Sequence, residues 1–221
     1  MEEQKIIRVL SIDFDYIMAP CLNLYNHLAH GDENPTVNWL FIEQELNIEN
    51  HLQYDAKYLQ AIVDIIIYQM RNGASFTAIE SHEEIVTKLK DLPDYKDVKF
   101  DVTNIDFHHD LIYDCENVNR MVDFDEYNCA NWFGYLYLKD KINHGTWFKA
   151  SNSPPPDYEK IKDFFADEEI CEVKPSFMLH SLWEEDKYDM IFLCKSPQWV
   201  PHQYEHLYNI VKAIGEAVTL V

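Results

Sequence analysis

The chain has 221 residues, and its 39 acidic side chains outnumber its 18 basic ones, giving a formal net charge of -21. Such a charge repels nucleic-acid phosphates, and the sequence offers no basic patch to offset it. The cysteines are widely spaced and form no CxxC pair. The sequence shows neither the apolar core of a signal peptide nor an apolar run long enough to span a bilayer. We therefore expect a cytoplasmic protein without membrane or nucleic-acid partners.

Predicted strands and helices alternate along the chain. In the first half the pattern predicts, in order, a buried strand over 5–12, a helical or loop segment over 16–30, a helix over 54–72, a strand over 76–80, a helix over 83–90 and a strand over 98–105. In the second half it predicts an aromatic strand or short helix over 131–138, a helix over 157–165, a strand over 190–194 and a closing helix over 202–217.

This alternation is typical of an α/β protein with a mainly parallel sheet. Three consecutive prolines at 154–156 predict a loop, because proline continues neither a helix nor a central strand. We place that loop inside a single domain of residues 1–221, since the residues beyond it would make a poor core of their own.

Acidic residues and histidines follow three of the predicted strands. The strand ends are Asp13-Phe14-Asp15, Glu80-Ser81-His82 and Asp106-Phe107-His108-His109-Asp110. Alternate positions of an extended chain share a face, so Asp13 and Asp15 should aim together, as should the side chains at 106, 108 and 110. In α/β folds such strand ends meet at one edge of the sheet, where ligands collect.

That many carboxylates repel one another unless a cation is bound between them. The six candidate metal ligands are Asp13, Asp15, His82, Asp106, His108 and Asp110. Oxygen donors with some nitrogen suit Mn²⁺, and six ligands suit two ions about 3.5–4 Å apart, which can lower the pKa of a shared water towards ~7. Taken singly, two of these motifs have a plainer interpretation. An Asp-x-Asp sequence after a strand is commonly a turn or a helix cap, and His82 could simply begin a helix.

The DFHHD sequence at 106–110 and the DFD sequence at 13–15 resemble the Asp-x-His-x-Asp and Asp-x-Asp motifs of the arginase and deacetylase superfamily. His82 precedes Asp106 at close to the spacing of that family's lone metal-binding histidine. The resemblance implies a three-layer α/β sandwich with two Mn²⁺ ions. It implies that Asp106 and Asp13 bridge the ions, that His82 and Asp110 complete one position, and that His108 and Asp15 complete the other.

The motif order departs from that of ordinary arginases, because here the Asp-x-Asp comes first, and the chain is considerably shorter. This arrangement resembles the peptide arginases, which convert arginine to ornithine, with release of urea, inside ribosomally made precursor peptides. The resemblance therefore implies an arginine-containing peptide as substrate and partner. The family also needs a carboxylate that holds the guanidinium, for which Glu80 is the candidate, and a proton shuttle, for which His109 and His144 are the candidates.

Other activities stay open at this point. The same metals could serve a small-molecule ureohydrolase or an amide deacetylase, because specificity lies in loops. A metal-stabilised protein that binds a basic peptide without turning it over is a further alternative. A phosphatase of the haloacid-dehalogenase type also begins with a strand and Asp-x-Asp, but the Tyr16-Ile17-Met18 that follows does not suit it.

Overall fold

The computed structural model describes residues 4–18, 39–40, 44, 53–113, 118–154, 171–183 and 187–218. The strands in this part of the chain are β1 (Lys5–Asp13), β2 (Ser75–Ile79), β3 (Val98–Asp106), β4 (Ile142–Lys149), β5 (Glu172–Pro175) and β6 (Met190–Cys194). They form one six-stranded sheet in the order β2-β6-β1-β3-β4-β5, and every neighbouring pair is parallel. The predicted α/β class with a parallel sheet is confirmed.

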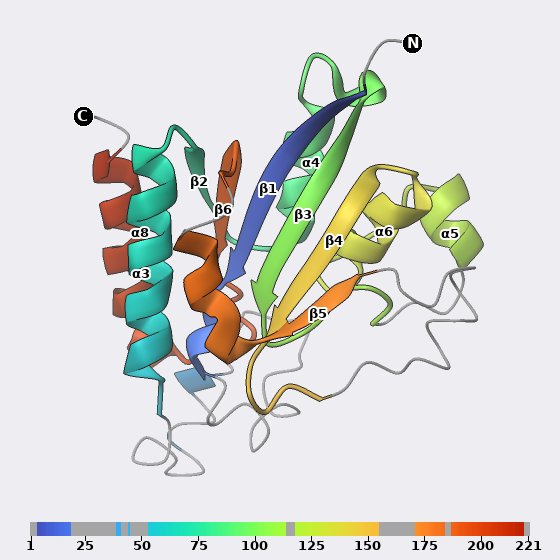
Figure 1. Ribbon diagram of the computed structural model, residues 1–221. Coiled ribbons are helices and arrows are strands. Elements are labelled where there is room, and N and C mark those ends of the chain that lie inside the picture. Colours follow the sequence, from blue (N-terminus) through green and yellow to red (C-terminus); the bar gives the residue numbers. More distant parts are fainter. Residues whose placement is uncertain are drawn as a thin grey trace.

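Helices cover both faces of this sheet (Figure 1). The α-helices are α3 (Ala56–Arg71), α4 (Glu83–Lys90), α5 (Val118–Asp123), α6 (Trp132–Leu138) and α8 (Glu205–Val218). Short 3-10 helices are η1 (Phe14–Met18), η2 (Tyr95–Asp97), η3 (Ser176–Trp183) and η4 (His202–Tyr204). Two separate apolar clusters, one on each face, give the molecule its layered core.

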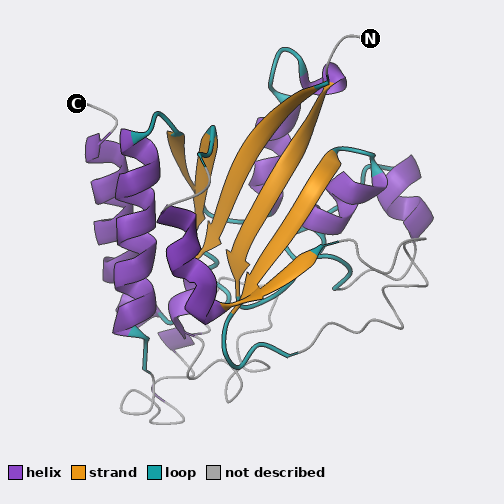
Figure 2. Ribbon diagram, in the orientation of Figure 1, coloured by secondary structure: helices purple, strands orange, loops and turns teal. Residues whose placement is uncertain are grey.

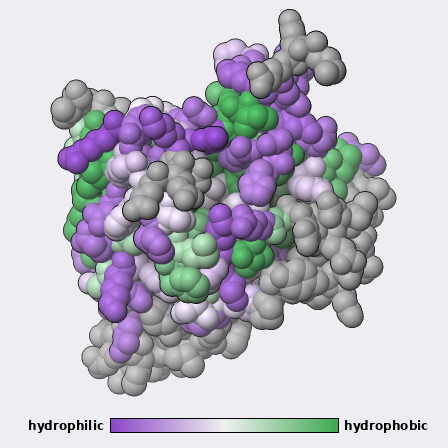
Figure 3. All heavy atoms as spheres, in the orientation of Figure 1, coloured by the Kyte–Doolittle hydropathy of each residue, from purple (hydrophilic) through white to green (hydrophobic). Residues whose placement is uncertain are grey.

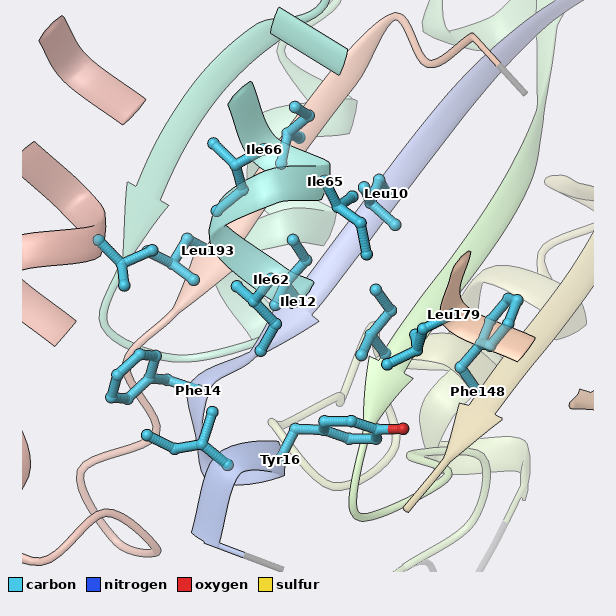
Figure 4. Close-up of a cluster of buried hydrophobic side chains, with 14 of the residues drawn as sticks. Leu10, Ile12, Phe14, Tyr16, Ile62, Ile65, Ile66, Phe148, Leu179 and Leu193 are labelled. Carbon is cyan, nitrogen blue, oxygen red and sulfur yellow. The ribbon is translucent and has the colours of Figure 1, made fainter. Parts of the chain in front are cut away.

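The first apolar cluster joins the sheet to α3, α8 and η3. Leu10 and Ile12 of β1 pack beneath Ile62 and Ile65 of α3, as Figure 4 shows. The helix begins where the Asp55 carboxylate accepts hydrogen bonds from two main-chain N–H groups of its first turn, at 2.8 and 3.3 Å. This face supplies apolar packing and no candidate ligand.

The second cluster joins the opposite face to α4, α5 and α6. Gly134 of α6 lies so close to the segment after β3 that a Cβ atom there would come 1.9 Å from the carbonyl oxygen of Leu111. The main-chain N–H groups of Phe133 and Gly134 both donate to the carbonyl of Asp110. Helix α6 therefore holds the 106–111 segment by direct backbone contact.

The carboxyl ends of β2, β6, β1 and β3 lie next to one another, and Figure 2 shows the connecting segments gathered at that edge. The chain leaves β1 for β2 on one side and returns to β3 on the other side. This reversal makes the crevice between the ends of β1 and β3 the topological switch point, where open α/β sheets bind ligands.

Several elements differ from the sequence prediction. The 131–138 segment, expected as a strand or a short helix, contains helix α6, whereas residues 143–145 lie within β4, a strand that was not predicted, with the turn before it at Asp140 (φ 54°). Strand β4 forms there because it pairs with β3, an interaction that local composition does not reveal. Helix α4 and strand β6 have the predicted bounds. The predicted helix over 157–165, and most of the 16–30 segment, lie outside the described residues.

The surface visible in Figure 3 is largely hydrophilic, as the net charge of -21 leads one to expect. Among the described helices, none combines the length and apolar character that crossing a bilayer requires.

Candidate metal centre

The six residues predicted as ligands come together at the switch point. Asp13 is the last residue of β1 and Asp106 the last of β3, Asp15 lies in η1, and His82 immediately precedes α4. All four carboxylates and His82 are buried, and His108 is partly buried. The turn after β3 folds back on itself, because Asp110 adopts a left-handed conformation (φ 50°) that brings its side chain to His82.

The first group of potential ligands, called here the His82 cluster, consists of His82, Asp106 and Asp110. The Nδ1 atom of His82 lies 2.8 Å from Oδ2 of Asp110 and 3.5 Å from Oδ2 of Asp106. It is also 3.5 Å from Oδ2 of Asp13, so three carboxylates converge on one ring nitrogen. The other ring nitrogen lies 3.3 Å from the hydroxyl of Ser11.

The second group, called here the His108 cluster, consists of Asp15, Asp106 and His108. The Nδ1 atom of His108 lies 3.1 Å from Asp15 and 3.9 Å from Asp106. Both carboxylate oxygens of the fully buried Asp15 lack a hydrogen bond of good geometry, and their polar neighbours are the His108 ring, the main-chain N–H of Phe107 and the side chain of Asp106. Buried charge without hydrogen bonds is costly, and a bound cation removes that cost.

Asp106 belongs to both clusters. Its Oδ1 atom accepts a hydrogen bond from the main-chain N–H of His108 (2.8 Å), and its Oδ2 atom accepts one from the amide of Asn104 (3.1 Å). The two oxygens are thus fixed in orientation, one towards each cluster. A carboxylate held in this way can bridge two neighbouring ions.

Burial dominates the electrostatics of the site. It raises the pKa of Asp13, Asp15 and Asp106 well above the usual carboxylate range, and repulsion between these neighbouring carboxylates and Asp110 adds to the effect. Burial raises the pKa of Asp110 to about 7, although the nearby His108 ring opposes the shift. Without a cation the site therefore holds protons, and a divalent ion would displace them.

A pocket of about 250 Å³ opens directly onto the clusters. Its lining residues are Asp13, His82, His108, Asp110, Tyr113, Cys129, Ala130, Ser196, Gln198 and Trp199. The His108 ring lies between Trp199, at 4.7 Å between ring centroids, and Tyr113, at 5.8 Å. The described lining thus combines carboxylates and imidazoles at its base with aromatic walls, and it contains no Lys or Arg.

The three candidates for guanidinium binding and proton transfer are placed differently. The side chain of Glu80 is 65% exposed and lies 3.4 Å from Lys195, away from the pocket lining. His144 lies near the amino end of β4, where it is the strand partner of Asp101 on β3. Asp101 is about 16 Å along β3 from Asp106. His109 is buried and stacks on Tyr113, with ring centroids 4.1 Å apart. Of the three, only His109 lies beside the pocket.

Several residues at the site were not among the predicted ligands or catalytic residues. The indole N–H of Trp132 donates to Oδ2 of Asp110 (2.8 Å), and that of Trp147 donates to the main-chain carbonyl of Asp106 (3.0 Å). The hydroxyl of Ser196, which has a left-handed conformation (φ 47°), donates to Asp13 (2.6 Å). Aromatic density and a Ser-Pro pair after a strand were the available signals. Cys194, beside Asp13, carried no signal beyond its position at a strand end.

We compared the chain with family models, with curated proteins and with solved structures. None of the three comparisons finds a match. The likeness to the arginase and deacetylase superfamily therefore rests on the motifs, on the parallel α/β fold and on the buried His/Asp clusters, which could hold metal ions.

Proposed function

We propose that this protein is a metal-dependent hydrolase of the arginase type that converts peptidyl arginine to ornithine and urea with two Mn²⁺ ions. The observation that carries the proposal is that Asp106 belongs to two His/Asp clusters at the base of one pocket. Two ions that share a carboxylate and face a common cavity are the arrangement in which metal pairs activate a water for hydrolysis.

The ligand roles follow the two clusters. Asp106 would bridge the ions, with His82 and Asp110 on one ion and His108 and Asp15 on the other. Asp13 would contribute on the His82 side, since it lies 3.5 Å from that ring. When bound, the ions would supply an activated water, with a pKa near ~7, and would neutralise the buried carboxylates. Hydrogen bonds from Asn104, Trp132 and Ser196 would orient three of these carboxylates.

The pocket supports a guanidinium as the group attacked. Hydrolysis adds water to the guanidinium carbon, and the C–N bond to the side chain breaks, so that urea leaves while the nitrogen on the peptide becomes the ornithine amine. The aromatic rings of Tyr113 and Trp199, which line the pocket, can stack on the planar face of the guanidinium cation. His109, stacked on Tyr113, is our candidate for the proton donor to the departing amine.

Two features of the pocket support a peptide, in place of free arginine, as the proposed substrate. The cavity of about 250 Å³ is slightly smaller than the usual range for ligand sites, which suits one side chain. Free arginine carries a carboxylate that needs a basic partner, and the described lining offers none. An arginine within a peptide has that carboxylate already in an amide bond.

The test is release of urea and ornithine by metal-stripped protein to which Mn²⁺ is added, with an arginine-containing peptide and free arginine as parallel substrates. We expect turnover of the peptide that depends on metal and falls by at least about 100-fold in Asp106→Asn, which retains the shape of the side chain. Asp101→Asn, on the same strand but at its opposite end, is the matched control and should retain activity.

Other outcomes would redirect the assignment. Equal turnover of both substrates would sink the peptide preference and leave a small-molecule ureohydrolase. Metal binding without urea release from either substrate would contradict the arginase activity, and acetylated lysine peptides would then test the deacetylase alternative. Peptide binding without turnover of any of these substrates would indicate the non-catalytic binding protein.

A further inference from the structure

Strand β6 brings a cysteine to the metal centre. Cys194 is the last residue of β6 and is fully buried. It pairs in register with Asp13 on β1 and with Ile79 on β2, the strand that leads into His82. Paired residues of neighbouring strands point to the same face of a sheet. Three adjacent strand ends thus deliver a carboxylate, a thiol and an imidazole to the same face.

These three side chains form a group of their own. Ligand atoms of Asp13, His82 and Cys194 all lie within 4.8 Å of one another, and all three residues are buried. A tetrahedral ion with bonds of about 2.0–2.3 Å holds its ligand atoms roughly 3.5 Å apart. Small rotations of the three side chains would bring their ligand atoms from within 4.8 Å of one another to that separation.

We propose that Cys194 binds, as a thiolate, the ion held by His82, and that this sulfur ligand makes the His82 position selective for Zn²⁺ or Co²⁺ over Mn²⁺. The His108 cluster offers only nitrogen and oxygen and retains the preference for Mn²⁺. Sulfur is a soft ligand that favours Zn²⁺ among the common divalent ions, whereas carboxylates suit Mn²⁺. The inference rests on the two-ion centre of the proposed function, but not on hydrolysis, and it replaces Mn²⁺ by Zn²⁺ or Co²⁺ at the His82 position.

The surroundings of Cys194 allow its thiol to lose a proton and bind an ion. The Ser196 hydroxyl lies 3.3 Å from the Cys194 sulfur and donates its hydrogen to Asp13. The thiol hydrogen therefore has two acceptors within reach, the Ser196 hydroxyl oxygen and the main-chain carbonyl of Glu80 at 3.7 Å. Binding of the ion would release that proton to solvent, and the ion–sulfur bond would replace one weak hydrogen bond.

The plainer role for Cys194 is that of a small apolar residue, since it also packs with Phe192 in the second apolar cluster. That role predicts no bond between sulfur and metal. A spectroscopic measurement separates the two, because a bond between Co²⁺ and a thiolate gives a charge-transfer absorption band in the near ultraviolet that nitrogen and oxygen ligands do not give.

The experiment is titration of the metal-free full chain with Co²⁺, followed by absorption, in the wild type and in three variants. We expect a sulfur-to-cobalt band that disappears in Cys194→Ser and persists in both controls. Cys171→Ser replaces a partly buried cysteine next to β5, away from the centre, and Cys129→Ser replaces the cysteine that lines the pocket. Competition of Zn²⁺ or Mn²⁺ with bound Co²⁺ should show that Cys194→Ser weakens Zn²⁺ binding by roughly 10- to 100-fold and weakens Mn²⁺ binding less.

The possible results are distinct. Co²⁺ binding without the sulfur band in the wild type overturns the inference and leaves the dimetal hydrolase intact. A band that persists in Cys194→Ser overturns it as well and assigns the bond to another cysteine. Absence of any Co²⁺, Zn²⁺ or Mn²⁺ binding overturns both the inference and the metal centre of the proposed function. Since the decisive band is recorded on the wild type, poor folding of Cys194→Ser would not conceal a negative result.

Discussion

The Nδ1 atom of His82 lies 2.8 Å from Oδ2 of Asp110, although 28 positions of sequence separate the two residues. The same carboxylate oxygen accepts the indole N–H of Trp132 at 2.8 Å. An imidazole from the start of α4 and an indole from α6 therefore meet at one oxygen of the segment after β3. An ion bound between His82 and Asp110 would replace their direct contact, and the Trp132 hydrogen bond would continue to orient the carboxylate.

Metal binding should stabilise the fold. At a free ion concentration 100 times the dissociation constant, linkage adds about 2.7 kcal/mol for one site. For a chain of this size that corresponds to a rise in Tm of roughly 5–10 °C. Scanning calorimetry of metal-stripped protein with and without Mn²⁺ measures it, with Mg²⁺ as a control for ionic strength. An unchanged Tm at saturating Mn²⁺, Zn²⁺ and Co²⁺ would contradict a metal centre built from these carboxylates.

The metal-free protein should lose stability as the pH rises from 5 to 8. Burial raises the folded-state pKa of Asp110 from 3.8 to about 7 and raises that of three neighbouring aspartates as well. The folded state therefore binds more protons than the unfolded state. The contribution of Asp110 to the free energy of unfolding consequently declines as the pH rises from 4 to 7. Surface carboxylates with a lowered pKa, such as Asp125, are ionised in both states above pH 5 and do not oppose the trend.

Urea denaturation midpoints across this pH range provide the measurement. Bound metal should flatten or reverse the trend, because ions bind the deprotonated carboxylates. Asp110→Asn removes one of the titrating groups and should make the dependence shallower. A metal-free protein that is more stable at pH 8 than at pH 5 would be inconsistent with buried, protonated aspartates.

Trp132→Phe should weaken metal binding more than Trp147→Phe. Both changes remove an indole N–H and replace a buried indole by a smaller ring, but Trp132 donates to a proposed ligand oxygen and Trp147 to a main-chain carbonyl. Loss of an outer-shell hydrogen bond to a ligand costs roughly 10- to 100-fold in metal affinity. Titration calorimetry with Mn²⁺ compares the two variants. Equal losses of Mn²⁺ affinity in the two variants would indicate general damage to packing, and would contradict a role for Trp132 in orienting Asp110.

Glu80→Gln and His144→Gln should each change kcat/KM by less than about three-fold. Glu80 is exposed beside Lys195, and the His144 side chain is 60% exposed near the other end of the sheet. Neither lines the pocket, so neither should contact the substrate in this structure. Steady-state assays with the arginine peptide decide the point. A large rise in KM for Glu80→Gln would restore its predicted role in holding the guanidinium.

His109→Gln should lower kcat by roughly 100-fold or more if His109 delivers the proton to the leaving amine. The same change should leave Mn²⁺ affinity close to that of the wild type, because His109 belongs to neither cluster. Its Nδ1 atom accepts a hydrogen bond from the main-chain N–H of Leu111, a contact that the glutamine oxygen can mimic. Parallel measurement of turnover and metal affinity separates a catalytic loss from collapse of the site. Unchanged kcat would remove His109 as the shuttle.

The sequence alone predicted the class of fold and the principal motifs because both depend on local pattern. The apolar run at 190–194 is a strand with those bounds, and the amphipathic segment at 54–72 contains α3. The aspartate and histidine motifs follow β1, β2 and β3, and the ends of parallel strands tend to share an edge of the sheet. That rule was sufficient to predict that residues 13, 82 and 106 lie together.

Local pattern was insufficient where pairing between distant segments decides the structure. Asn143 and Gly145 favour a turn on their own, yet the ladder with β3 draws them into β4. The fold-back that brings Asp110 to His82 depends on α6, whose N–H groups hold the Asp110 carbonyl. Neither interaction involves residues that are close in sequence.

Only the tertiary structure decided that β6 lies between β2 and β1. That strand order places Cys194 and Ser196 beside Asp13, whereas in sequence they are as far from it as almost any residue of the chain. Hydrophobic periodicity shows that a segment is a strand, but it does not show which strand lies next to it, because strand order depends on how the helices pack over both faces. The carboxylates of this centre were therefore predictable from the sequence, and the thiol beside them was not.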